Sequence, residues 1–314
     1  MPWTDPLGAK GPLWAMTPMG GACRGRWACW AQGARMTGHR AGSWNRVGRQ
    51  PGLVFGTVVL AVAVLGALLA PWLAPYPPNE ISLGEQLQGP SLAHPLGTDF
   101  FGRDLLSRLL FGARATLGVA ALAVTIAVIA GMAVGLAAGW SRGWLGQGWV
   151  ALIDLLLAFP ALLLALLVVA LLGAGLATLA IAVGIAGIPA YARVVRSIGL
   201  STRSASYVDA ARAMGASTVH ILRRHLWPNA IAPAIALATV DVGRVILYVA
   251  ALGFLGLGAA PPQAEWGMML YEGRQYLGTA PWASMAPGLA IALTVVAVTL
   301  LGDAITDALE NRPL

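Results

Sequence analysis

The sequence carries little charge for its length. Asp, Glu, Lys and Arg make up 11% of the 314 residues, whereas a soluble globular domain typically carries about 25%. Hydrophobic residues make up 58%, and the mean hydropathy is +0.72. Disorder requires low hydrophobicity and high charge, so the composition excludes disorder for the chain as a whole. It also argues against a soluble enzyme, because a water-facing surface needs more charge than this sequence supplies.

Cysteine and lysine are also scarce. Two cysteines, Cys23 and Cys29, are too few for a disulfide framework, and no His cluster beside them completes a metal motif. Lys10 is the only lysine. A phosphate-binding P-loop needs the pattern G-x-x-x-x-G-K-[ST], and Lys10 follows Ala9, so the sequence contains no P-loop. If ATP drives a process that involves this chain, another subunit binds the ATP.

Long uncharged apolar runs dominate the rest of the sequence. A membrane-spanning helix needs about 20 apolar residues, because lipid offers no partners for backbone polar groups. The stretch 155–192 is uncharged and too long for one crossing, and the natural break in it is Gly173-Ala174-Gly175. We therefore predict an all-α integral membrane protein with six spans, at residues 53–73, 115–140, 149–172, 176–192, 229–257 and 284–301.

Arginine is distributed unequally between the two sides. Six spans put both termini on one side, where the tails and loops hold 15 basic residues against four on the other side. The positive-inside rule then predicts that both termini are cytoplasmic. We predict four parts: a cytoplasmic N-terminal tail (1–50), a transmembrane anchor with an external loop (51–112), a transmembrane domain (113–305) and a cytoplasmic tail (306–314).

The first 35 residues mix Trp, Gly, Cys and Arg without periodicity. They lack the apolar core of a signal peptide, and Met36 offers a second start. We hypothesise that residues 1–35 are a mis-called start or a disordered tail, which sequencing the N-terminus of the native protein would test.

The loop 191–228 is long, basic and helical in pattern. Ser206 with Asp209 resembles a capping box, Gly215 breaks the helix, and Ser217 can cap a second helix. The pattern predicts two short helices joined by a glycine turn on the cytoplasmic face. On composition alone, an amphipathic helix lying on anionic lipid is an equal alternative.

The same loop carries a family resemblance. The pattern D-A-A-x-x-x-G begins at Asp209, and Pro228 follows its glycine by thirteen residues. This resembles the EAA loop of ABC importer permeases, although Asp209 stands where the family usually has Glu, Trp227 where it has Leu, and His225 where it has Ile. The segments HPLGTDFFGRDLLSRLLFGAR, DLLLAFPALLLAL, LGFLGLGAAPPQAEWGMML, WASMAPGLAI and LLGDAITDAL also resemble the C-type permease subunit of dipeptide, oligopeptide and nickel importers. The resemblance covers about residues 52–312.

The resemblance implies a type I ABC importer (MetI-like) transmembrane fold with an extra N-terminal span, in a bacterial cytoplasmic membrane. It implies half of a translocation pathway for short peptides, nickel or another small solute. The implied partners are a homologous second permease, two ABC ATPase subunits and an external solute-binding protein, besides the lipid bilayer. ATP and Mg²⁺ would bind the ATPases, and this chain would bind no cofactor, metal or nucleic acid and catalyse nothing itself.

The resemblance also assigns a coupling role to the EAA loop, residues 193–228, which would seat in a groove on the ATPase. Small residues allow close approach, the glycine supplies the turn, and the acid can cap the helix or pair with a partner cation. The expected coupling residues are Asp209, Ala210, Ala211, Gly215, Arg223, Arg224 and Pro228.

Three ionisable residues lie within predicted spans. Asp241 and Arg244 are three apart and can meet on one helix face, either as a structural pair or lining the substrate path. Asp154 lies near the inner end of its span, where an interfacial position is the simpler interpretation. In the external loop we expect His94, Asp99, Arg103 and Asp104 to serve in helix capping and subunit docking.

Two other functions compete with a permease subunit. A stand-alone secondary transporter or channel would usually show internal inverted repeats, and the sequence has no matching halves. A membrane-embedded enzyme would need catalytic motifs such as HExxH or G-x-S-x-G, which are absent. An ATPase partner that co-purifies with the chain would discriminate between these hypotheses.

Overall fold

The computed structural model describes residues 51–310, and the side chains of residues 51–306. The predicted N-terminal tail, with its hypothesised mis-called start at 1–35, lies outside the described residues. Within 51–310 the elements are helices, and one isolated β-bridge joins Thr98 and Asp104. The predicted all-α membrane fold is confirmed.

Five of the described helices are long and apolar enough to cross a membrane. They are α3 (Pro51–Leu68), α5 (Leu105–Trp140), α8 (Leu176–Arg203), α11 (Trp227–Phe254) and α13 (Trp282–Glu310). Each overlaps one predicted span, although α3 and α11 end five and three residues before the predicted ends. Hydropathy located the apolar core of these helices but not their ends: α5 begins ten residues before the predicted span, and α8 continues eleven residues beyond it.

The remaining predicted span, 149–172, is not a single straight helix. It is divided between α6 (Gly143–Ala158) and α7 (Ala161–Leu172), which meet at an angle of 94° and form a sixth span only if the bent pair counts as one. Phe159 and Pro160 separate them in extended backbone. Proline lacks an N–H and clashes with the preceding helical turn, so the helix ends before it.

The predicted glycine break between the third and fourth spans is confirmed. Helix α7 ends at Leu172, and α8 begins at Leu176. Gly173 and Gly175 between them have φ values of 87° and 154°, a region that favours glycine over residues with a Cβ.

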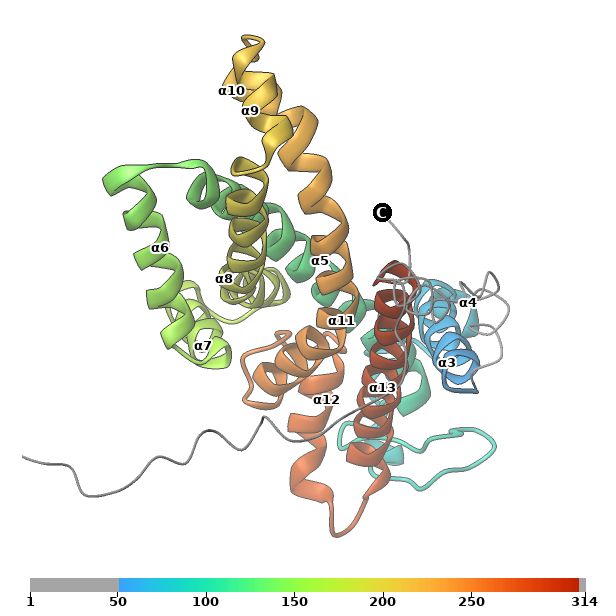
Figure 1. Cartoon of the computed structure of the whole chain (residues 1–314). Helices are drawn as coiled ribbons and strands as arrows, with labels where there is room; N and C mark the ends of the chain where they lie inside the picture. Colours follow the sequence, from blue (N-terminus) through green and yellow to red (C-terminus); the bar gives the residue numbers. More distant parts are fainter. Residues whose placement is uncertain (1–50, 311–314) are drawn as a thin grey trace, which may run out of the picture. The chain divides into compact units, whose positions relative to one another are not determined.

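Helices α5 and α8 lie side by side and approach each other closely (Figure 1). Gly131, Gly135 and Gly139 of α5 face α8 at intervals of one turn, and a Cβ on Gly135 would lie 2.7 Å from the backbone oxygen of Ala192. Small residues of this kind let membrane helices pack backbone to backbone. Helix α11 packs against α8, α5 and α13, and the extra N-terminal helix α3 packs mainly against α13.

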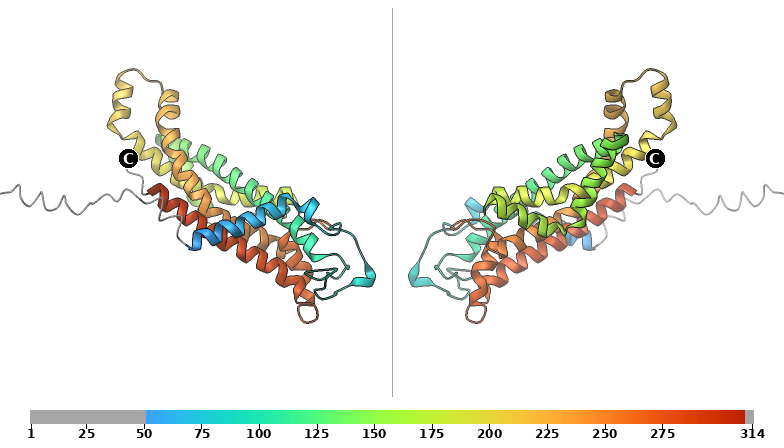
Figure 2. Two further views of the ribbon diagram at one scale, coloured as in Figure 1. Left: turned by 90° about the vertical axis from the view of Figure 1, so that its right-hand side faces the viewer. Right: turned by 90° about the vertical axis from the view of Figure 1, so that its left-hand side faces the viewer.

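Two groups of short elements extend from opposite ends of these long helices (Figure 2). At one end are α9 (Ser206–Ala213), α10 (Thr218–Ile221) and a π-helical turn, η2 (Leu222–Leu226), between α8 and α11. At the other end are α4 (Ala70–Leu73), the loop to α5 with η1 (Leu83–Glu85), α12 (Trp266–Gly273) and η3 (Arg274–Tyr276).

Candidate functional site

Residues 193–228, which resemble an EAA loop, form the coupling segment, named for its expected role. Its first eleven residues continue α8 as far as Arg203, and it then contains α9, α10, η2 and the first two residues of α11. Two short helices joined by a glycine turn were predicted here. The first helix and the turn are present, whereas the second is not a separate helix, because α10 and η2 continue without a break into α11. Gly215 has a φ of 82° and directly follows the C-cap of α9. The Gly215 N–H donates to Arg212 O and the Ala216 N–H donates to Ala211 O, which is the Schellman arrangement that ends many helices.

The two predicted helix caps have different outcomes. Ser217 caps α10 as predicted, because its Oγ accepts a hydrogen bond from the His220 N–H at 3.3 Å. The predicted Ser206 cap is wrong: Ala205 is the N-cap of α9, and Ser206 is the first helical residue. Asp209 is then one position too late for a capping box, and its Oδ1 accepts from Arg212 Nη1 at 2.8 Å instead.

Most of the expected coupling residues are exposed. The Asp209 side chain is 67% exposed, and Ala210, Gly215, Arg223, Arg224 and Pro228 are also exposed, whereas Ala211 is buried. Ser217, Val219, His220, Arg223, Arg224, His225 and Pro228 line an open, basic groove. The segment therefore presents its small, acidic and basic groups outward.

The coupling segment is tied at its base to the inner end of α5. The Arg203 Nη1 donates to the Trp140 carbonyl oxygen at 3.2 Å, and the Arg212 guanidinium lies 5.4 Å from the centre of the Trp140 ring. A mainly apolar hollow of about 590 Å³ lies alongside, between the end of α5 and the η2–α11 junction, and is lined by Leu136, Ala137, Trp140, Ser141, Leu222, Arg223 and Trp227. Movement of the segment would therefore reach α5 as well as α8 and α11.

The ionisable residues in the spans form two groups. The Tyr191 hydroxyl of α8 donates to Asp241 Oδ2 of α11 at 3.0 Å, and Arg244 Nη2 lies 2.5 Å from Asp241 Oδ1. Asp241 is buried, whereas the Arg244 side chain is 47% exposed. The Asp154 carboxylate of α6 pairs with Arg193 of α8 at 3.1 Å, and both of these side chains are exposed. The structure thus brings Asp241 and Arg244 together and places Asp154 apart from them in a separate pair.

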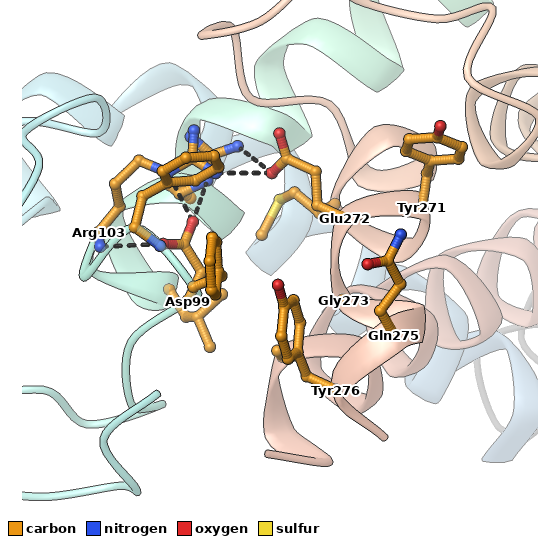
Figure 3. A pocket seen from close by; sticks show the side chains of 13 residues that line it. Asp99, Arg103, Tyr271, Glu272, Gly273, Gln275 and Tyr276 are labelled. Atoms are coloured by element: carbon orange, nitrogen blue, oxygen red, sulfur yellow. Dashed lines mark hydrogen bonds and ion pairs between the residues drawn. The ribbon is translucent and has the colours of Figure 1, made fainter. Parts of the chain in front are cut away.

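A third group, the external charge cluster, consists of Asp99, Arg103, Arg108 and Glu272 (Figure 3). Arg103 Nε donates to Asp99 Oδ2 at 2.6 Å, and Arg103 Nη2 donates to Glu272 Oε2 at 2.7 Å. Arg108 Nη2 donates to the same Glu272 oxygen at 3.0 Å, and its side chain is 1% exposed. These residues, with Phe100 and Tyr276 among others, line a pocket of about 230 Å³. The cluster joins the loop before α5 to α12.

Beside this cluster, Asp104 is the N-cap of α5, which agrees with the capping role expected for this loop. Its Oδ2 accepts from the Ser107 N–H at 2.8 Å, and its Oδ1 lies 3.0 Å from His94 Nδ1. Arg108 and Glu272 were not predicted as site residues, because they lie 164 positions apart and carry no local signal of their contact.

Glu265 is a further buried group that was not predicted. Its carboxylate caps α12 by accepting from the N–H groups of Gly267 and Met268 at 2.8 and 2.9 Å, and it accepts from the Thr116 hydroxyl of α5 at 3.0 Å. Burial raises the pKa of Glu265 above its ordinary value, and these hydrogen bonds oppose the rise. The sequence did contain a signal of this site, because Glu265 is the one charged residue in the run 245–271.

Comparison with known families covers most of the chain. Residues 131–313 match the family described as "Binding-protein-dependent transport system inner membrane component". Residues 41–90 match "N-terminal TM domain of oligopeptide transport permease C".

Similar curated proteins are permeases. The chain is 42% identical over 275 residues to the di/tripeptide transport system permease protein DppC of Pseudomonas aeruginosa, which covers 86% of this chain and 91% of the relative. It is 43% identical over 270 residues to the glutathione transport system permease protein GsiD of Shigella flexneri, covering 86% and 89%.

A solved structure of the MetNI methionine ABC transporter in an inward-facing conformation has the same fold. It is similar to this chain with a TM-score of 0.52 at 22% identity, and the match covers 64% of this chain and 96% of that one. The predicted MetI-like transmembrane fold is confirmed.

Proposed function

We infer the role of this chain from the family to which it belongs, the binding-protein-dependent transport system inner-membrane components: it is a multi-pass membrane subunit of an ABC importer. We propose that its cargo is a short peptide. The relatives named above are named for the transport of di/tripeptides and of glutathione, and both kinds of cargo are short peptides with a free carboxylate. The extent of the match, more than four fifths of each chain, supports extending the substrate class to this chain.

We propose that the working importer contains a homologous second permease, two ABC ATPase subunits and an external solute-binding protein. ATP and Mg²⁺ would bind the ATPases, in keeping with the lack of a P-loop in this sequence. This chain would then supply half of the pathway and no catalytic group.

The observation that carries this proposal is the construction of the coupling segment. It presents exposed Asp209 and Ala210 on α9 and exposed Gly215 in the turn that follows, while its base is bonded to Trp140 of α5. Small residues allow an ATPase surface to approach closely, and the outward carboxylate can pair with a cation of that surface. We propose that closure of the ATPases on ATP displaces this segment, and that α8 and α11, which leave it at either end, turn together because Tyr191 is bonded to Asp241.

The test is uptake by the assembled importer after Asp209→Lys. The substitution should leave membrane insertion and co-purification of the second permease intact, while ATP-driven peptide uptake is lost. Asp209→Glu, which restores the residue usual in the family, is the matched control and should transport like the wild type. Unchanged uptake by Asp209→Lys would refute the coupling role, and a wild-type chain that co-purifies with no ATPase would refute the proposed assembly.

A further inference from the structure

Arg244 lies deep within a span. The 16 residues before Asp241 and the 20 residues after Arg244 contain no Asp, Glu, Lys or Arg. Arg244 lies ten residues before the end of α11, about 15 Å along the helix axis. Ionisable side chains at such depth face protein or a water-filled path, because lipid offers a charge no hydrogen bonds. The exposed part of Arg244 therefore faces something other than lipid in the assembled importer.

The ion pair that holds Arg244 is asymmetric. The Asp241 side chain is 2% exposed, and this chain satisfies both of its oxygens, one through the Tyr191 hydroxyl and the other through Arg244. The Arg244 side chain is 47% exposed, and Nη2 is the nitrogen that meets Asp241. Within residues 51–306, no other hydrogen bond or ion pair reaches this guanidinium. Asp241 is therefore buried with both oxygens bonded, while Arg244 keeps N–H donors that face outward.

Apolar residues surround Arg244 on the exposed face of α11. Val240, Leu247 and Phe254 are exposed on this face, four residues before, three after and ten after Arg244. The opposite face of the helix is packed, because Val245, Ile246 and Val249 are buried there. A few polar groups set in an apolar lining are typical of sites that bind small molecules.

We propose that Arg244 binds the C-terminal carboxylate of the peptide as it crosses the pathway, and that Asp241 and Tyr191 are positioning residues that hold the guanidinium. This inference rests on the proposed peptide cargo. Short peptides differ in their side chains but share a terminal carboxylate, and the planar fork of arginine matches a carboxylate. A carboxylate of the second permease fits less well, because Asp241 already neutralises Arg244 and a permanent second acid would bury excess negative charge in a dry interface.

The experiment compares two forms of one peptide in proteoliposomes that hold the complete importer. One form has a free C-terminus, and the other has a C-terminal amide. The peptide is chosen so that both of its forms saturate the solute-binding protein. Wild-type importer should favour the free carboxylate. Arg244→Gln should lower uptake of that form about tenfold, as expected for a lost charge-assisted hydrogen bond, and leave uptake of the amide nearly unchanged.

A second variant keeps the proposal testable if Arg244→Gln folds poorly, since that change leaves Asp241 buried without its cation. The double variant Arg244→Gln/Asp241→Asn removes both charges at nearly constant shape and should show the same loss of preference for the carboxylate. Arg244→Lys keeps the charge without the fork and should give an intermediate preference. Arg142→Ala, which removes an exposed arginine elsewhere, should keep the wild-type preference.

The possible results test the role of Arg244 and the peptide cargo separately. An unchanged preference in the double variant would overturn the role of Arg244. So would an equal loss of both peptide forms together with loss of the second permease on co-purification, because that result would place Arg244 in the subunit interface. A wild-type importer that transports neither form would contradict the peptide cargo itself.

Discussion

The external charge cluster and the coupling segment use charged residues in opposite ways. In the cluster, two arginines and two carboxylates are largely buried and bonded to one another across segments more than 160 positions apart. In the coupling segment, Asp209 is 67% exposed, and its partner Arg212 is three positions away on the same helix. The cluster fixes two parts of this chain to each other, whereas the segment leaves its charged groups available to another protein.

This contrast separates residues that stabilise the fold from residues that serve transport. Buried, multiply bonded charges are strongly coupled to folding, because removal of one partner leaves the other unpaired in a low dielectric. Exposed pairs between neighbouring helical residues contribute little to folding. Substitutions at the external cluster should therefore affect mainly stability, and those in the coupling segment mainly transport.

The largest effect is expected for Arg108→Ala. The substitution leaves Asp99 and Glu272 with one fewer cation in a buried site, and the chain should lose roughly 3 kcal/mol of stability. Thermal unfolding of the purified protein in detergent measures the change. The matched control is Arg114→Ala on the next turns of α5, an exposed position that should cost under about 0.5 kcal/mol. Equal destabilisation by both variants would show that the buried ion pairs of the cluster add no particular stability.

An intermediate effect is expected for Gly215→Ala. Nothing lies within 4 Å of a Cβ at this position, so the loss of about 1 kcal/mol should come from the positive φ alone. Gly148→Ala in α6 is the control, since its Cβ also meets nothing within 4 Å but the backbone there is helical. That variant should keep or gain stability, because alanine favours a helix. A stable Gly215→Ala protein with full transport would mean that the turn tolerates another geometry.

The smallest effect on stability is expected for Asp209→Asn. It removes one exposed pair with Arg212, which should cost about 0.3 kcal/mol. Peptide uptake should nevertheless fall by far more than this change in stability explains. Unfolding and uptake measured on the same preparation give the two values. If uptake and stability fall in proportion, the carboxylate serves only the fold.

Local signals made much of the fold predictable. Uncharged apolar runs located the cores of the spans, the Gly173–Gly175 sequence located the break before α8, and Gly215 with Ser217 located the turn and the second cap of the coupling segment. Each of these features depends on residues that are close in sequence, so the local sequence is enough to predict it. Pro160 also indicated the break between α6 and α7, but the prediction followed the continuous hydropathy of the run and gave one span.

Long-range features were not predictable in the same way. The contact between Arg108 and Glu272 depends on how α12 packs against the start of α5, and nothing in either neighbourhood specifies it. The ends of α5 and α8 were missed for a related reason. Hydropathy reports lipid exposure, whereas these helices continue into regions where the Asp104 cap and the Arg203 bond to Trp140 sustain them.

Helix α5 connects the two contrasted regions, and its anchorage sets how it can move. It is 36 residues long, or about 54 Å, with Arg108 fixed among the outer carboxylates and Trp140 held by the base of the inner segment. Gly131, Gly135 and Gly139 let its inner half pack closely against α8, so the two helices form one rigid unit. A force applied at the inner end would rotate this unit about its fixed outer end instead of moving it along its axis. The largest displacement of the two helices would then occur at the cytoplasmic opening.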